Sequence, residues 1–511
     1  MDNLKPKIAI VTFTDDRDVG VSNPQVEKML KARQEDLKDF LGKNSIEAID
    51  LLSKGKDVDD GWYGIRNIKD IQRIVKISND AEVEAVIIGA WTWSPPMLIM
   101  EFVRRINKPF MYYTENDPMS GNLSQFSAAC SSLMEWGVNR YALLNERNFG
   151  NRSEMLKWVR AVSAISRMRE SAMMLWGGTY AVKMEQLQDD VPKLKSFLIR
   201  DILSEDQYIL VNRAEKMIKN NPSRIKGFKD WLQKNGMKIT YDERMLTNEA
   251  FIKQTALLLA ARDRLKEYEA ENICGVSIKC QPEIYSEYGV NACTLPAFLP
   301  FPVNEEGPQK VYPTVCEGDI KGLLTSMMLN FLNPGVPPAF GDLVSAEDDY
   351  IEFANCGAGS LFWAANSIQA KDALKNTAAV ANIHGCSGAA FSYCGKASPE
   401  ITVARLTRIH GEYYMQFGKG KALDSEEFLK KKLGSDFGGH LGSTWGKVTV
   451  DLGVRAENFV KVIGANHLSA TLGDFTSEIE IFCRYAGIDT LRLDSDMEME
   501  NFYKSIRRSR V

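Results

Sequence analysis

Short apolar runs alternate with amphipathic stretches along the first third of the chain. Residues 8–13 and 48–52 are typical of strands, and residues 26–41 between them have the apolar spacing of a helix. Strands that alternate with helices form βαβ units, in which helices cover both faces of a parallel sheet. Before the helix expected at 154–170, the alternation continues through further apolar runs at 85–90, 109–113 and 141–144. The pattern predicts a doubly wound N-terminal domain over residues 1–171.

The rest of the chain predicts two more domains, because 511 residues are too many for one ordinary hydrophobic core. A second alternating pattern, which includes a long helix at 248–268, predicts another α/β domain over residues 172–345. Beyond it, residues 401–408 and 413–417 alternate in polarity and favour an antiparallel pair. We therefore expect an α/β fold of two doubly wound parallel-sheet domains, followed by a mixed, largely antiparallel β domain over residues 346–511.

The composition excludes several function classes. The net charge is −4 and the one basic cluster, residues 507–510, is best interpreted as a solvated tail, so we expect no nucleic-acid partner. Nine scattered cysteines, an odd number without a CxxC pair, predict reduced thiols rather than a disulfide framework. The N-terminus lacks the apolar stretch of a signal peptide, and no apolar run could span a membrane. We expect a soluble cytoplasmic protein.

Histidines are scarce and polar residues end two apolar runs. Of four histidines, His467 ends the run 462–467 at a turn of small residues, a place from which a side chain can enter a cleft. Glu317 and Asp319 follow the strand expected before a helix, where ligands gather in parallel sheets. Helix capping is sufficient to explain Asp319 but not Glu317. Asp342 follows a second apolar run, and each carboxylate taken singly also has an ordinary structural explanation.

Motifs of several other enzyme classes are missing. A third glycine is lacking after Gly357 and Gly359, and there is no GxxxxGK[ST], HExxH or GxSxG sequence. Cys386 and Cys394 lie near His384, but buried inert thiols are the favoured interpretation.

Three segments, residues 316–322, 340–343 and 464–467, are similar to the metal-ligand segments of L-fucose isomerases, in the L-fucose/L-arabinose isomerase superfamily. Their order and rough spacing agree with that family as well. Residues 5–10 with 16–21 resemble its opening, and its sugar-contacting segments resemble residues 89–91 ahead of Met97, 279–281 and 443–445.

The resemblance implies a metal-dependent aldose–ketose isomerase. Glu317, Asp342 and His467 would hold Mn²⁺, with Mg²⁺ or Co²⁺ as alternatives, since oxygen ligands with one imidazole suit such ions. Glu317 and Asp342 would also move a proton between C1 and C2 of an open-chain sugar through an enediol.

The family likewise implies substrate contacts and an oligomer. Trp91 and Trp445 would pack against the sugar, and Gln281 and Asn466 would bind its hydroxyls. Arg17 would reach the substrate of a neighbouring subunit within a hexamer, whose pocket the N-terminal domain closes.

Departures from the family leave the substrate open. The chain is shorter than most members, and Cys356 stands where the family often places a serine near the sugar. L-arabinose isomerases use two glutamates and two histidines, which Asp342 argues against. L-fucose, D-arabinose or another hexose, including a 6-modified one such as a sulfosugar, fit the resemblance. A metal-dependent aldolase or epimerase and a non-catalytic sugar-binding protein are the alternatives.

Arg17 provides a test of the shared pocket. The Arg17→Ala and Glu317→Gln proteins, each inactive alone, should regain partial activity when they are dissociated and reassembled together, because one subunit supplies the arginine and another the glutamate. Mixed oligomers that stay inactive would contradict shared sites. Full activity of Arg17→Ala alone would make Arg17 a surface charge paired with its aspartate neighbours.

Overall fold

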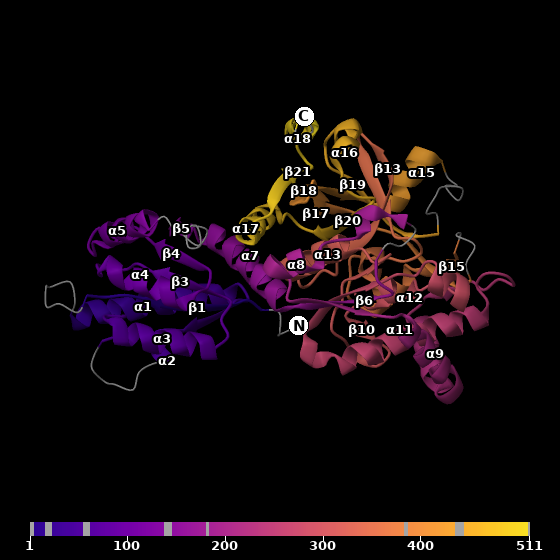
Figure 1. The fold of residues 1–511 in the computed structure, drawn as a ribbon, viewed down its shortest axis with the longest axis horizontal. Helices are drawn as coiled ribbons and strands as arrows, with labels where there is room; N and C mark the ends of the chain where they lie inside the picture. Colours follow the sequence, from indigo (N-terminus) through magenta and orange to yellow (C-terminus); the bar gives the residue numbers. More distant parts are fainter. Residues whose placement is uncertain are drawn as a thin grey trace. The chain divides into compact units, whose positions relative to one another are not determined.

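The computed structural model describes residues 5–15, 23–54, 62–136, 146–179, 183–382, 387–434 and 444–508. The chain forms two compact units, residues 1–167 and 168–511 (Figure 1). The division into three domains at residues 171 and 345 stays a prediction.

The N-terminal unit is built on a five-stranded parallel sheet in the order β2-β1-β3-β4-β5. Helix α4 packs between α3 and α5, while α1 packs against β1 and β2. The expected strand at 141–144 lies outside the described residues. The strands are β1 (Lys7–Thr12), β2 (Glu47–Asp50), β3 (Ala85–Gly89), β4 (Phe110–Thr114) and β5 (Glu146–Phe149), and the helices are α1 (Pro24–Lys43), α2 (Leu51–Lys54), α3 (Ile68–Asp80), α4 (Pro96–Ile106), α5 (Asn122–Glu135) and α7 (Arg152–Glu170).

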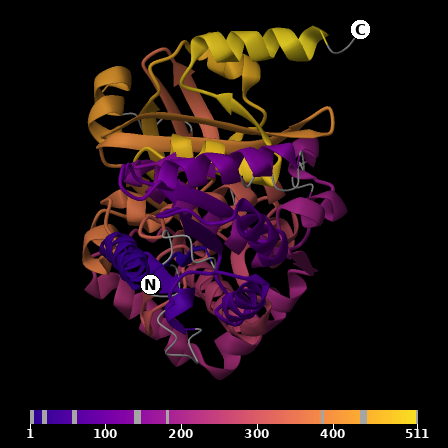
Figure 2. The ribbon, with the colours of Figure 1, turned by 90° about the vertical axis from the view of Figure 1, so that its left-hand side faces the viewer.

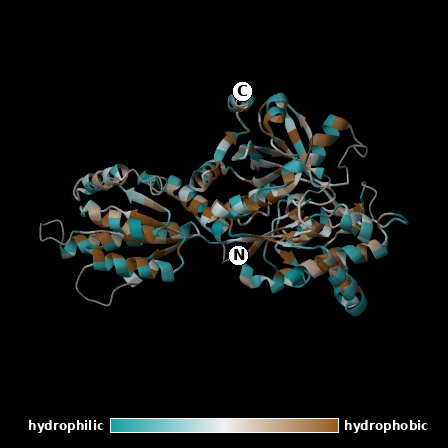
Figure 3. Cartoon of the chain, in the orientation of Figure 1, coloured by the Kyte–Doolittle hydropathy of each residue, from teal (hydrophilic) through white to brown (hydrophobic). Residues whose placement is uncertain are grey.

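The C-terminal unit begins with a second parallel sheet, four strands in the order β12-β9-β6-β7. Its strands are largely apolar, and the helices at the surface of the unit present polar outer faces (Figure 3). The strands are β6 (Ala172–Trp176), β7 (Asp201–Glu205), β9 (Ile273–Ile278) and β12 (Thr314–Cys316), and the helices are α8 (Val191–Phe197), α9 (Tyr208–Asn220), α10 (Pro222–Lys234), α11 (Asn248–Glu267), α12 (Thr294–Phe298) and α13 (Ile320–Leu332).

Six antiparallel strands of the ten-stranded C-terminal sheet close into a ring in the order β18-β17-β20-β13-β14-β19, because β19 pairs back with β18. Strand β21 extends the ring beside β18, and β16, β15 and β8 extend it beside β19. These strands are β8 (Lys238–Ile239), β13 (Ala339–Glu347), β14 (Tyr350–Ala354), β15 (Ala378–Ala381), β16 (Ala389–Cys394), β17 (Ser398–Ile409), β18 (Glu412–Leu423), β19 (Gly446–Asp451), β20 (His467–Leu472) and β21 (Asp489–Arg492).

The expected fold class is confirmed, with two parallel sheets followed by a mixed, mostly antiparallel one. Strand β8 comes from the segment before residue 345 and yet joins the C-terminal sheet. Helix α18 runs beside α16 and β21 (Figure 2). The helices of this part are α14 (Ala370–Lys375), α15 (Ser425–Leu433), α16 (Ala456–Val462), α17 (Thr476–Ala486) and α18 (Asp496–Arg508).

Helix α13 joins the parallel sheet to the ring. Every residue from Ile320 to Leu332 is buried, in a helix that is largely apolar. The helix contacts β9 and β12 of the parallel sheet and β17 and β20 of the ring. Two glycines permit this close packing, since a Cβ at Gly275 would lie 2.7 Å from Met327 Sδ and one at Gly322 would lie 2.7 Å from an Arg405 nitrogen. Helix α13 therefore packs at close range against both the parallel sheet and the ring.

None of the described helices combines the length and apolar character needed to cross a membrane. The cytoplasmic location stays a prediction.

Candidate metal centre

Glu317 lies in the turn between β12 and α13. Its backbone N–H donates to the Ile278 carbonyl (2.9 Å), which continues the pairing of β12 with β9 for one more residue. Glu317 then adopts φ +66°, followed by Gly318 at φ +71°, and α13 begins at Ile320. A Cβ on Gly318 would collide with the Gly178 carbonyl, so only glycine fits there. The turn thus holds the Glu317 carboxylate at the carboxyl end of a parallel strand.

Asp342 and His467 come from neighbouring strands of the ring. They are directly paired across antiparallel β13 and β20, so both side chains project from the same face of the sheet. At the adjacent position, the Leu343 N–H donates to the Asn466 carbonyl (2.6 Å). Residues 125 positions apart (467 − 342) are therefore held side by side by sheet register.

The three predicted ligands converge in the C-terminal unit. His467 Nε2 lies 3.3 Å from a Glu317 carboxylate oxygen and 3.3 Å from Asp342 Oδ1. One ligand atom of each residue lies within 4.8 Å of the other two. His467 is fully buried and Glu317 is 9% exposed. His467 Nε2 and Glu317 Oε2 are buried atoms that find no hydrogen-bond partner among the described residues, which is costly unless a further group satisfies them.

The other ring nitrogen of His467, Nδ1, has a buried carboxylate as its partner. His467 Nδ1 is 2.7 Å from Asp319 Oδ2, and Asp319 also binds Arg405 and caps α13 through the Gly322 N–H. Burial alone would raise the pKa of Asp319, but Arg405 and His467 hold that pKa well below its usual range. For His467 the signs are reversed, since burial would lower the pKa but the carboxylates of Asp319, Asp342 and Glu317 raise it well above its usual value. A positive charge beside Nε2 is therefore stabilised, whatever carries it.

These atoms fit a hard divalent cation. Two carboxylates and one imidazole converge, and hard oxygen ligands of this kind are preferred by Mg²⁺ and Mn²⁺. The nearby thiol of Cys316 instead donates to Asn355 Oδ1 (3.0 Å), and burial, with Glu317 next in effect, raises its pKa well above the usual value. A thiolate ligand from Cys316 is thus disfavoured.

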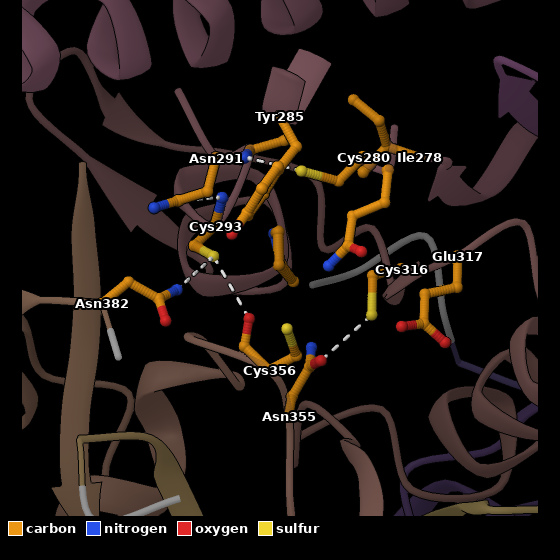
Figure 4. A pocket seen from close by; sticks show the side chains of 13 residues that line it. Ile278, Cys280, Tyr285, Asn291, Cys293, Cys316, Glu317, Asn355, Cys356 and Asn382 are labelled. Atoms are coloured by element: carbon orange, nitrogen blue, oxygen red, sulfur yellow. Dashed lines mark hydrogen bonds between the residues drawn. The ribbon is translucent and has the colours of Figure 1, made fainter. Parts of the chain in front are cut away.

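A cavity opens beside Glu317 (Figure 4). Its wall contains the predicted sugar-binding Gln281 and the divergent Cys356, together with amide side chains that can donate and accept hydrogen bonds. Burial raises the pKa of Cys280 to about 12, so this thiol of the cavity wall is protonated at neutral pH. The remaining lining residues are Ile278, Tyr285, Asn291, Ala292, Cys293, Pro296, Cys316, Asn355 and Asn382.

The other predicted site residues lie in different surroundings. Asn466 donates to Asp342 Oδ1 (2.7 Å), and its own oxygen accepts from Gln186 Nε2 (3.1 Å). Trp445 is buried directly before β19. Trp91 lies in the N-terminal unit, buried, with its Nε1–H donating to Gln34 Oε1 (3.1 Å). Arg17 lies outside the described residues. The sugar-contacting roles of these residues stay predictions.

Sequence reasoning missed two groups around the centre and only partly described a third. Asp319 was a site candidate whose position capping was sufficient to explain; it does cap α13, and it also contacts the His467 ring. Arg405 is fully buried in β17, and an arginine inside the apolar run 401–406 was a sign of a buried charge that needs a partner. Gln186, on the segment between β6 and β7, had no distinguishing pattern.

Comparison with known proteins agrees with this architecture. Residues 353–493 match the family "L-fucose isomerase, C-terminal domain". Over 192 residues the chain is 29% identical to a sulfoquinovose isomerase of Alkalicoccus urumqiensis, covering 36% of this chain and 39% of that protein. Over 166 residues it is 29% identical to a sulfoquinovose isomerase of Priestia aryabhattai, covering 32% and 33%. The matches thus span between a third and two fifths of these relatives.

The fold class is therefore that of an α/β protein with a C-terminal antiparallel ring that carries two of three converging ligands. The predicted resemblance to L-fucose isomerases is confirmed, since residues 353–493 match the C-terminal domain of that family.

The left-handed backbone conformation at residue 317 has an effect on stability that can be tested separately from the chemistry of the Glu317 carboxylate. An L-residue with a Cβ costs about 1–2 kcal/mol in this region and glycine does not. We expect metal-free Glu317→Gly to be about 1 kcal/mol more stable than Glu317→Ala, because only the alanine variant keeps the strain. Urea unfolding in the presence of a chelator measures the difference. Equal stability of the two variants would show that the turn relaxes and stores no strain.

Proposed function

We propose that the protein is a divalent-metal-dependent isomerase that interconverts an aldose and its ketose. The observation that carries the proposal is the convergence of Glu317, Asp342 and His467 on one buried point, with two atoms left unpartnered among the described residues. The cavity beside Glu317 has a mainly apolar wall that also includes the amide side chains of Gln281 and Asn355, and the relatives that the chain resembles are sugar isomerases.

Glu317, Asp342 and His467 would hold the ion, which we propose is Mn²⁺, with Mg²⁺ or Co²⁺ meeting the same preference for oxygen ligands. When bound, such an ion polarises a carbonyl and stabilises negative charge that develops on its oxygen.

The carboxylates would perform the proton transfer. In an open-chain aldose one carboxylate removes the proton from C2, a proton moves from O2 to O1, and a proton returns to C1 to give the ketose. Asn466 holds the Asp342 carboxylate by donating to Oδ1, and Gln186 fixes the Asn466 amide in turn. Glu317 is almost fully buried, so little water can compete with the substrate for its proton.

Gln281 and the other amides of the cavity would orient the sugar hydroxyls, and Trp91, Trp445 and Arg17 would complete the substrate contacts. The substrate class we favour is a hexose modified at C6, such as a sulfosugar, because the matched relatives are sulfoquinovose isomerases and Cys356 gives the cavity a thiol wall. L-fucose and D-arabinose are the next candidates. We also propose a homohexamer in the cytoplasm, with Arg17 reaching a neighbouring subunit's pocket.

A panel assay tests this function. Metal-stripped protein incubated with Mn²⁺ and a set of aldoses, including L-fucose, D-arabinose and sulfoquinovose, should form the ketose in NMR spectra, and chelator should abolish the reaction because the ligand set is left empty. Deuterium from D₂O should appear at C1 if a carboxylate carries the proton. Full turnover in excess EDTA, with no metal by elemental analysis, would contradict the metal mechanism. Shortened carbon chains would indicate an aldolase, and binding without turnover a sugar-binding protein.

Glu317→Gln and Asp342→Asn should each lower turnover by several orders of magnitude. Acid–base catalysis alone supplies about 10²–10⁴-fold, and the neutral amide is also a weaker metal ligand. Steady-state kinetics at saturating Mn²⁺, with bound metal measured in parallel, give the result. Glu352→Gln is a matched control, since Glu352 is another buried carboxylate of the same unit, on β14. Near-normal rates in both variants with metal bound would show that other groups carry the proton.

A further inference from the structure

Arg405 is a buried cation at the junction of α13 and the ring. It is fully buried on β17, and its guanidinium lies so close to α13 that residue 322 has no room for a Cβ. Nη1 is 2.5 Å from Asp319 Oδ2 and Nη2 is 3.1 Å from Asp319 Oδ1, a two-pronged contact that only a guanidinium can make.

Both carboxylate oxygens of Asp319 are engaged in contacts with neighbouring groups. Its Oδ1 accepts from the Gly322 N–H (2.9 Å) and from Arg405, and its Oδ2 accepts from Arg405 and faces His467 Nδ1 (2.7 Å). The arginine and the backbone amide can only donate, so Asp319 is a carboxylate that accepts throughout. The proton between Asp319 and His467 therefore belongs to Nδ1, and the lone pair of the neutral ring is on Nε2, toward Glu317 and Asp342.

Three acidic side chains, Glu317, Asp342 and Asp319, lie against His467. Arg405 is the buried basic side chain that binds Asp319. Lys321, the basic residue in the first turn of α13, forms its ion pair with Asp189 (3.0 Å). Without Arg405, Asp319 would lose two of its four hydrogen bonds.

We propose that Arg405 is a positioning residue for the centre. It acts through Asp319 to hold the imidazole of His467 in the Nδ1–H form, with Nε2 presented to a divalent cation. The proposal rests on the proposed function, since it assumes that Glu317, Asp342 and His467 bind metal. The simpler alternative is that Arg405 only ties β17 to α13.

Metal affinity and stability, measured side by side, distinguish a positioning role of Arg405 from a purely structural one. We would compare the wild type with two variants. Arg405→Lys keeps the positive charge but not the bidentate guanidinium, and Asp319→Asn keeps a side-chain oxygen to cap α13. Arg262→Lys is the matched control, since Arg262 is a buried arginine of the same unit that binds both oxygens of Glu305. Mn²⁺ affinity is measured by calorimetry on metal-stripped protein, stability by thermal melts, and the nitrogen coupling of bound Mn²⁺ by pulsed EPR.

We expect Arg405→Lys and Asp319→Asn to weaken Mn²⁺ binding by about 10–100-fold, the usual effect of losing a partner behind a metal ligand. The nitrogen coupling should be altered in Asp319→Asn at saturating Mn²⁺. Arg262→Lys should lower the melting temperature while its Mn²⁺ affinity stays within about twofold of the wild type.

Affinity within about twofold of the wild type in both Arg405→Lys and Asp319→Asn, with unchanged nitrogen coupling, would overturn the proposal and leave metal binding itself intact. A wild type that binds no Mn²⁺ would overturn the proposed function as well. If neither variant folds, ¹⁵N NMR of Mg²⁺-saturated wild type labelled at histidine decides, with His467→Gln to assign the signal. A proton on Nδ1 of His467 supports the proposal, and a proton on Nε2 overturns it.

Discussion

The buried contact between Asp319 and Arg405 is the interaction on which the rest of the C-terminal unit depends. It joins the first turn of α13 to strand β17, and so joins the parallel sheet to the antiparallel ring. Both side chains are fully buried, and a buried charge is tolerated only when it is paired and hydrogen-bonded. Because Asp319 also contacts His467, the same ion pair that connects two layers of the fold reaches the back of the candidate metal centre.

The centre combines two structural solutions to the same problem. Asp342 and His467 are placed by register, since opposite residues of adjacent antiparallel strands share a face. Glu317 is placed by a turn, in which a left-handed backbone redirects the chain from β12 into α13. The ligands therefore approach from different layers of the unit, and α13, buried on all sides, fixes the separation of those layers.

The sequence indicated the ligands more readily than their surroundings. Glu317 and Asp342 were site candidates because each follows an apolar run at a strand boundary, and His467 because histidines are rare and this one ends such a run. Their grouping as ligands came from the resemblance to L-fucose isomerases. The ring could not be foreseen, because closure depends on the pairing of β18 with β19, and no local pattern encodes which distant strands meet. Arg405 was missed for a related reason, since its partner lies 86 residues away (405 − 319) and on a different type of element.

Closure of the ring has a consequence for the range of ions that the centre can accommodate. A ring without free edges cannot shear one strand past its neighbour without breaking pairs on both sides, so the spacing between Asp342 and His467 is as rigid as the ring itself. Glu317 is attached differently, through a turn and three side-chain torsions. A difference in the radius of a bound ion would therefore be accommodated by side-chain torsions, and Glu317, with three of them, has the widest range of the three ligands.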